Sequence, residues 1–176
     1  MRHTILIGNP GSGKSTAARM IQPSLDIDDL LRAQHGAPLS SAVQKLGGAD
    51  RFIDIEYTTL KRVLKTLTYP HVIATGGSAV HHPLFASLVA NHCVIWMYAS
   101  VPTIFSRIKD LQTRGIVSSS NHSNLALTDL LKIREAMYRQ CAEMCINTEE
   151  NNLDKTVQII EQIHCKTPIT ITTTTK

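Results

Sequence analysis

The feature that most constrains this chain is a glycine-rich run at residues 8–16, which reads GNPGSGKST and follows directly on a short apolar stretch. The run satisfies the pattern G-x-x-x-x-G-K-S in the context that this pattern needs, between a predicted strand and a predicted helix. Its glycines allow the backbone to curl so that successive N–H groups point inward, and the start of the helix adds partial positive charge. The sequence therefore predicts a loop that holds the phosphate groups of a nucleotide.

Individual residues of this loop have predictable roles. Lys14 is expected to reach the β- and γ-phosphates and to act in catalysis. Ser15 is expected to place its hydroxyl on a Mg²⁺ ion that bridges those phosphates. We therefore expect ATP and Mg²⁺ to be used together. The expected nucleotide-binding residues are Gly11, Ser12, Gly13, Lys14, Ser15 and Thr16.

Five short apolar runs rich in β-branched residues alternate with segments of helical periodicity. The predicted strands are residues 3–7, 25–27, 71–75, 92–98 and 144–148, and the predicted helices are 14–21, 28–35, 50–68, 83–90, 101–109, 126–141 and 153–164. Strands and helices in alternation indicate an α/β fold with a parallel sheet. Because the strands are apolar throughout, helices are expected to cover both faces of that sheet.

The length of 176 residues, 43% of them hydrophobic, fits one globular domain over residues 1–165. Two segments depart from the alternation of strands and helices. Residues 110–124 are polar, and we expect either a mobile lid or a plain disordered loop there. Residues 166–176 are rich in threonine, and we expect a disordered tail.

Composition excludes several classes of protein. The formal net charge is +4, but the basic residues are scattered and aromatic residues make up only 5%, so we expect no nucleic-acid partner. No apolar run approaches the roughly 18 residues of a membrane span, and the first residues lack the pattern of an export signal. We therefore expect a cytoplasmic protein without a membrane partner, whose four cysteines are free thiols.

The acidic residues indicate which phosphate chemistry to expect. The sequence has no Asn-Lys-x-Asp element for guanine, and no acidic residue ends the strand at 71–75. Acids stand instead at Asp26, Asp28 and Asp29, after the second predicted strand. Asp26 is expected to hold Mg²⁺ through water, and Asp28 to orient an acceptor hydroxyl or to take its proton. The alternative is that Asp28 or Asp29 caps the next helix; we assign only Asp29 a structural role.

In the order of its motifs the chain resembles the shikimate kinase family, small P-loop kinases of the nucleoside-monophosphate-kinase type. The resemblance covers about residues 3–164 and rests on five elements. They are the loop at 8–16, Asp26-Ile27-Asp28, the glycine turn at 74–80, Arg114 in TRGIV at 113–117, and Arg134 followed by Tyr138 in REAMY at 134–138. The resemblance implies a three-layer α/β/α fold with a mobile lid and a five-stranded parallel sheet in the order 2-3-1-4-5.

The resemblance also implies an activity, the ATP- and Mg²⁺-dependent phosphorylation of shikimate to shikimate 3-phosphate in aromatic amino acid biosynthesis. By analogy with family members we expect a monomer whose partner is this small molecule. The implied roles are closure over the phosphoryl group for Arg114, contact with adenine for Arg107 and Asn152, and acceptor binding for Asp28, Gly76, Gly77 and Arg134. Arg134 is implied to meet the carboxylate of the acceptor. The alternatives are a plain tight turn at residues 76–77 and a surface Arg134 paired with Glu135 or Asp129.

The chain departs from the family pattern on the acceptor side. Ile53 stands where the family has a second arginine on the acceptor carboxylate, and Ser78 stands at the third glycine of the turn. Arg51 is two positions away and would point about 200° round a helix, so it is a poor substitute. A lost charge-assisted bond costs about 1.5 to 3 kcal/mol. A kinase for another small hydroxylated acid or alcohol, and a nucleotide-binding module without catalysis, are therefore the alternative hypotheses.

Overall fold

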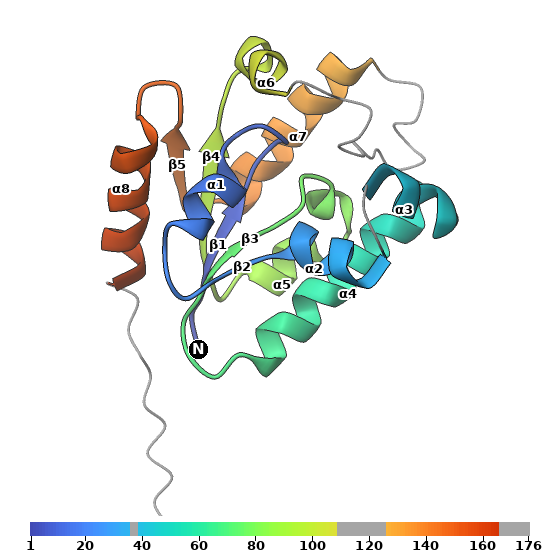
Figure 1. Cartoon of the computed structure of the whole chain (residues 1–176), viewed down its shortest axis with the longest axis horizontal. Coiled ribbons are helices and arrows are strands. Elements are labelled where there is room, and N and C mark those ends of the chain that lie inside the picture. The colour runs from blue at the N-terminus through green and yellow to red at the C-terminus, as the bar shows by residue number, and fades with distance from the viewer. Residues whose placement is uncertain (36–38, 109–125, 166–176) are drawn as a thin grey trace, which may run out of the picture.

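The computed structural model describes residues 1–35, 39–108 and 126–165 (Figure 1). In these ranges five strands form one parallel sheet, and their order is β2-β3-β1-β4-β5. The strands are β1 (Thr4–Ile7), β2 (Ser24–Asp26), β3 (Val72–Ala74), β4 (Cys93–Tyr98) and β5 (Met144–Asn147). The predicted strand order is confirmed. The predicted lid at 110–124 and the predicted tail at 166–176 lie outside the described residues.

Helices follow the strands in alternation, as predicted. They are α1 (Lys14–Arg19), α2 (Ile27–His35), α3 (Leu39–Lys45), α4 (Ala49–Thr66), α5 (Phe85–Val89), α6 (Val101–Arg107), α7 (Leu127–Cys141) and α8 (Leu153–Cys165), with a 3₁₀ turn η1 (Ala79–His81). The periodicity of the sequence did not predict α3. Its two large apolar residues, Leu39 and Val43, lie one turn apart and pack in the larger core cluster, but a helix of seven residues is too short for its periodicity to stand out in the sequence.

The two faces of the sheet are covered by different helices. Alternate residues of β4 point to opposite faces. Cys93, Ile95 and Met97 join one buried cluster with residues of α1 and α8, whereas Val94 and Trp96 join another with residues of α2, α4, α5 and α7. The second cluster is the larger of the two. Helix, sheet and helix therefore form three layers, as predicted.

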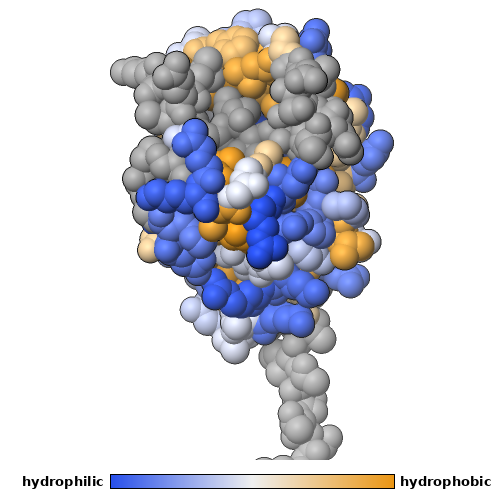
Figure 2. Space-filling view, turned by 90° about the vertical axis from the view of Figure 1, so that its right-hand side faces the viewer, coloured by the Kyte–Doolittle hydropathy of each residue, from blue (hydrophilic) through white to orange (hydrophobic). Residues whose placement is uncertain are grey.

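The layers can be followed in the views of the whole molecule. Figure 1 shows α3 and α4 on the side of the molecule opposite α8. Figure 2 views the molecule from the side of α3 and α4, where hydrophilic side chains surround smaller hydrophobic areas. The outward face of α4 is accordingly polar, with Arg51, Asp54 and Lys61 exposed, while its inward face carries buried apolar residues.

Four histidines gather where β1, β3 and β4 begin. His3 is 1% exposed, and its ring centroid lies 5.1 Å from that of His92 and 6.3 Å from that of His71. Backbone N–H groups bind two of the rings, because His3 N donates to His92 Nδ1 and His71 N donates to His3 Nδ1, each at 3.2 Å. Thr4 Oγ1 lies 3.0 Å from Nδ1 of His164 on α8. A histidine cluster therefore stands at the amino edge of the sheet.

All five strands run in the same direction, so the loops after them meet at the opposite, carboxyl edge. Within the described ranges, no helix is long and apolar enough to cross a membrane. The four cysteines form no disulfide and are free thiols, as predicted.

Candidate active site

The loop between β1 and α1 has a backbone that only glycine adopts readily. Gly8, Gly11 and Gly13 have φ values of +146°, +80° and +91°. A Cβ on Gly8 would stand 2.4 Å from the carbonyl oxygen of Met97, so a side chain has no space there. The loop therefore curls tightly against the end of β4 and leads into α1 through Gly13, as the glycine pattern predicted.

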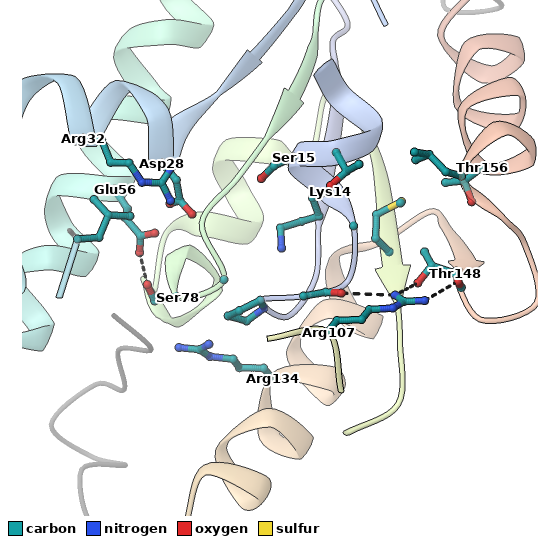
Figure 3. A pocket seen from close by; sticks show the side chains of 18 of the residues that line it. Lys14, Ser15, Asp28, Arg32, Glu56, Ser78, Arg107, Arg134, Thr148 and Thr156 are labelled. Atoms are coloured by element: carbon teal, nitrogen blue, oxygen red, sulfur yellow. Dashed lines mark hydrogen bonds between the residues drawn. The ribbon is translucent and has the colours of Figure 1, made fainter. Parts of the chain in front are cut away.

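Lys14 is held at this loop by the loop's own backbone. Its side chain is buried, and Nζ donates to the carbonyl oxygens of Gly8 at 2.8 Å and Asn9 at 3.0 Å. These bonds keep the ammonium group at the mouth of the loop, beside the start of α1 (Figure 3). A positive charge there, next to a helix N-terminus, suits an anionic ligand.

A cavity of about 460 Å³ extends from the loop in two directions. Gly11, Gly13, Lys14, Ser15 and Thr16 line it, whereas Ser12 is fully buried and is not among the lining residues. From the loop the cavity continues to the segment after β5, which contributes Thr148 and Asn152. We call this part the nucleotide half, after the ligand predicted for it, and the part toward Asp28 and Arg134 the acceptor half.

Arg107, from the end of α6, closes the outer side of the nucleotide half. Its guanidinium donates to Oγ1 and to the carbonyl oxygen of Thr148, both at 2.9 Å, and to the carbonyl oxygen of Gly11 at 3.4 Å (Figure 3). Arg107 and Asn152, predicted to contact adenine, are thus brought to the same part of the cavity.

The residues predicted to hold Mg²⁺ supply oxygen ligands, which that ion prefers. Asp26 is 8% exposed, and its Oδ1 accepts the backbone N–H of Asp28 at 2.9 Å. Its Oδ2 is buried and accepts no hydrogen bond from the described part of the chain. Such an orphaned carboxylate oxygen suits a hydrogen bond from a water ligand of a metal. Ser15 lines the cavity, whereas Asp26 lies behind Asp28 and does not line it. The described residues contain no group of three or more His, Cys, Asp or Glu side chains placed to hold a metal by themselves.

The hydrogen bond from Asp28 N also corrects one expectation. The second strand was expected to extend through Ile27, and Asp28 or Asp29 was considered as the helix cap. The side chain that bonds to the first turn of α2 belongs to Asp26, and the helix begins at Ile27. Ile27 points into the core, as required for Asp28 to line the cavity.

The acceptor half of the cavity is built round the glycine turn after β3. A Cβ on Gly76 would lie 1.8 Å from Glu56 Oε1 and 2.8 Å from Asp28 Oδ1, so both carboxyl groups contact the backbone there. A Cβ on Gly77 would lie 2.9 Å from Pro10 Cδ and 3.4 Å from Arg134 Nη1. The structure therefore brings Asp28, both glycines and Arg134 together, although Gly76 lies behind the residues that line the cavity.

Glu56 of α4 is a site residue that the sequence motifs did not reveal. It is 1% exposed, lines the cavity, and accepts a hydrogen bond from the Ser78 hydroxyl. Burial, followed by the negative charge of Asp28, raises the pKa of Glu56 to about 8. Burial and the charge of Asp26 also raise the pKa of Asp28, against the opposing effect of Lys14 and Arg32. The available signal was its place in the sequence, three residues after Ile53, where the chain departs from the family pattern.

Arg134 lies inside the molecule. Its side chain is fully buried on α7, so pairing at the surface with Glu135 or Asp129 is excluded. Its Nε donates to Nε2 of His81 at 3.0 Å, and one turn later the Tyr138 hydroxyl donates to the carbonyl oxygen of Gly77 at 2.7 Å. His81, at the end of the 3₁₀ turn η1, therefore orients Arg134. Burial lowers the pKa of Arg134, and the nearby Tyr138 and Glu56 oppose this effect.

Two further predictions, for Asp29 and for Arg114, have different outcomes. Asp29 pairs with Arg19 at 2.8 Å and with Arg32 at 2.6 Å and does not line the cavity, which agrees with the structural role assigned to it. Arg114, predicted to be catalytic, lies outside the described residues.

The parallel sheet has a phosphate-binding loop after its central strand, and one cavity joins this loop to a buried carboxylate and a buried arginine. Together these features define a class of protein: the P-loop phosphotransferases that act on an alcohol group of a small molecule. The sequence pattern of the shikimate kinase family matches residues 10–164, and this chain belongs to that family.

Individual relatives agree with the family assignment. A shikimate kinase of Caldicellulosiruptor bescii is 29% identical over 93% of this chain and 96% of its own length. One from Haemophilus influenzae is 30% identical over 92% of each chain. Among solved structures, shikimate kinase from Acinetobacter baumannii in complex with shikimate superposes with a TM-score of 0.77, at 26% identity over 93% of this chain and 92% of that one.

Proposed function

We propose that this protein transfers the γ-phosphoryl group of ATP to a hydroxyl of shikimate and requires Mg²⁺. The observation that carries the proposal is the single cavity, which joins Lys14 and the phosphate-binding loop to Asp28, Gly77 and Arg134. The donor and the acceptor can therefore lie end to end, as in-line transfer requires. The relative that binds shikimate shares this fold over nearly its whole length.

The residues present suggest how each reactant is held. The loop backbone and Lys14 bind the phosphates, and Arg107 and Asn152 flank the nucleotide base. Ser15 and, through water, Asp26 would hold Mg²⁺, which when bound offsets the negative charge of the phosphates. Arg134 binds the carboxylate of shikimate, and its buried guanidinium makes that contact a strong one.

The transfer step involves Asp28. The hydroxyl oxygen of shikimate forms a bond to the γ-phosphorus while its proton passes to the Asp28 carboxylate. The bond from the γ-phosphorus to the bridging oxygen breaks, and ADP leaves. Burial raises the pKa of Asp28, which makes its carboxylate a stronger proton acceptor. Arg114 would close over the phosphoryl group, as the resemblance implies.

A coupled assay of ADP release tests the proposal. ATP and Mg²⁺ are supplied, shikimate is titrated to high concentration, and reactions without acceptor and with excess EDTA are run in parallel. We expect turnover that saturates with shikimate and that EDTA abolishes. The turnover rate of the Lys14→Met variant is expected to fall about 100-fold or more, because the negative charge on the transferred phosphoryl group loses its cationic partner.

Turnover no greater than the rate without acceptor, with nucleotide binding retained, would contradict the proposal. A panel of hydroxylated acids would then test the second candidate, a kinase for another acceptor, which Ile53 favours. The absence of transfer to every member would leave a nucleotide-binding module without catalysis.

A further inference from the structure

Ile53, at the position where the resemblance places a second arginine, does not face the acceptor half of the cavity. Ile53 is 4% exposed and packs in the larger core cluster with Ile27, Leu31 and Phe52. It is not among the residues that line the cavity. Arg51 is exposed on the outward face of α4 and does not line the cavity either. This part of α4 therefore offers no cation to an acceptor.

Arg32 lines the same cavity from α2. It follows Asp28 by four residues, which places the two side chains on one face of the helix, one turn apart. Figure 3 shows Arg32 beside Asp28 and on the side of Glu56, while Arg134 enters the cavity from α7. The two arginines therefore approach the acceptor half from different elements.

A carboxylate holds Arg32 in place without enclosing it. Nη1 of Arg32 donates to Asp29 Oδ1 at 2.6 Å, and Asp29 Oδ2 accepts from Arg19 Nη2 at 2.8 Å. The Arg32 side chain remains 39% exposed. A guanidinium has five donors, so a bond through Nη1 leaves the rest of the fork able to reach a ligand.

The charges of the site favour a second cation for an anionic acceptor. Asp28 and Glu56 both contact the backbone of Gly76, so a carboxylate bound nearby meets negative charge from Asp28. Arg134 offsets one negative charge, and an acceptor carboxylate adds another. Arg32 and Arg19 share the single carboxylate of Asp29, so these three side chains keep one net positive charge, and an opposite charge at close range stabilises an anion.

We propose that Arg32 binds the carboxylate of the acceptor together with Arg134, and so replaces from α2 the arginine that α4 lacks. This inference rests on the proposed function, because it requires an acceptor that carries a carboxylate. It makes Arg32 a residue that determines specificity for acids over neutral alcohols.

The test compares Arg32→Gln and Arg32→Lys with the wild-type protein and with the matched control Arg51→Gln, which removes an exposed arginine outside the cavity. Steady-state rates are measured against shikimate and against ATP, and affinities for shikimate and for its methyl ester are measured by calorimetry with ADP present. We expect Arg32→Gln to raise KM for shikimate about tenfold, with KM for ATP changed less than about twofold. Arg32→Lys is expected to recover part of the loss, and Arg51→Gln to behave as wild type.

The methyl ester separates a contact with the carboxylate from a general disturbance. Arg32→Gln is expected to weaken shikimate but to leave the ester almost unaffected. Equal weakening of acid and ester, or an unchanged KM for shikimate in an active enzyme, would overturn the role of Arg32 while the proposed function stands. If the wild type shows no shikimate-dependent turnover, the proposed function fails. Calorimetry then decides on Arg32: weaker shikimate binding in Arg32→Gln supports it, and equal or undetectable binding overturns it.

Discussion

Glu56 illustrates how burial changes the chemistry of one residue. The carboxyl group lies against the backbone of Gly76, next to Asp28, and bonds to Ser78. With a pKa of about 8 it keeps its proton at neutral pH, so the pair of carboxyl groups carries one negative charge less than the sequence alone indicates. Pattern reasoning could place Asp28 in the site but not Glu56, because the role of Glu56 depends on the contact between α4 and the glycine turn.

Ionisation of Glu56 should weaken acceptor binding at alkaline pH. As pH rises through about 8, Glu56 loses its proton and adds a negative charge near the carboxylate of shikimate. We expect KM for shikimate to rise above this pH, and Glu56→Gln to remove the rise while keeping most of the activity at pH 7. Rates measured from pH 6 to 9.5 check this. The same alkaline rise in Glu56→Gln would assign the titration to another group.

The structure of α2 combines a helix start with a candidate metal ligand. Asp26 caps the helix through Oδ1 and leaves Oδ2 buried, so one side chain has two separable functions. The capping bond explains why the helix begins at Ile27, one residue earlier than predicted. The apolar runs and the glycine pattern predicted the other strands and the loop after β1 within a few residues, because those features are local. The helix α3 could not be predicted, because its few apolar residues depend on neighbours for their burial.

Two substitutions at Asp26 should separate these functions. Asp26→Asn keeps an oxygen that accepts the Asp28 N–H. Asp26→Ala loses this helix cap, which should lower the free energy of unfolding by about 1 kcal/mol. Both variants lack the charge for a metal. We expect the Mg²⁺ concentration for half-maximal turnover to rise about tenfold in both, and the free energy of unfolding to fall more in Asp26→Ala. Chemical denaturation and Mg²⁺ titrations measure the two effects. An unchanged Mg²⁺ requirement in Asp26→Asn would remove Asp26 from the metal site.

At the scale of the whole molecule, the two edges of the sheet carry different groups of side chains. The carboxyl edge carries the cavity, and the amino edge carries the cluster of His3, His71, His92 and His164. Burial, followed by the charges of His92, His71, the N-terminus and His164, lowers the pKa of His3 to about 4. Burial also lowers the pKa of His92 and of His164.

The histidine cluster should make the fold sensitive to acid. His3 is neutral in the folded protein down to about pH 4, whereas in the unfolded chain it takes up a proton near the ordinary histidine pKa of 6.5. Stability is therefore fully present above pH 6.5 and is lost as pH falls towards 4. At about 1.4 kcal/mol per pKa unit, His3 alone accounts for about 3 kcal/mol of this loss. Urea denaturation from pH 7.5 to 4 measures the slope, and His3→Gln, which retains an acceptor for the His71 N–H, should flatten it. A slope equal to that of the wild type would assign the acid sensitivity to other groups.

The contacts of α7 connect the two halves of the cavity, with a consequence for how strongly each ligand binds. Arg134 and Tyr138 lie on one face of this helix, at the acceptor half and the glycine turn, while the Leu131 carbonyl accepts a hydrogen bond from Asn9 of the nucleotide loop at 3.2 Å. A ligand that orders α7 from one half of the cavity would therefore change the binding free energy of a ligand in the other half. Such coupling is reciprocal by thermodynamic necessity, so any factor by which a nucleotide tightened the binding of an acceptor would equal the factor by which the acceptor tightened the binding of the nucleotide.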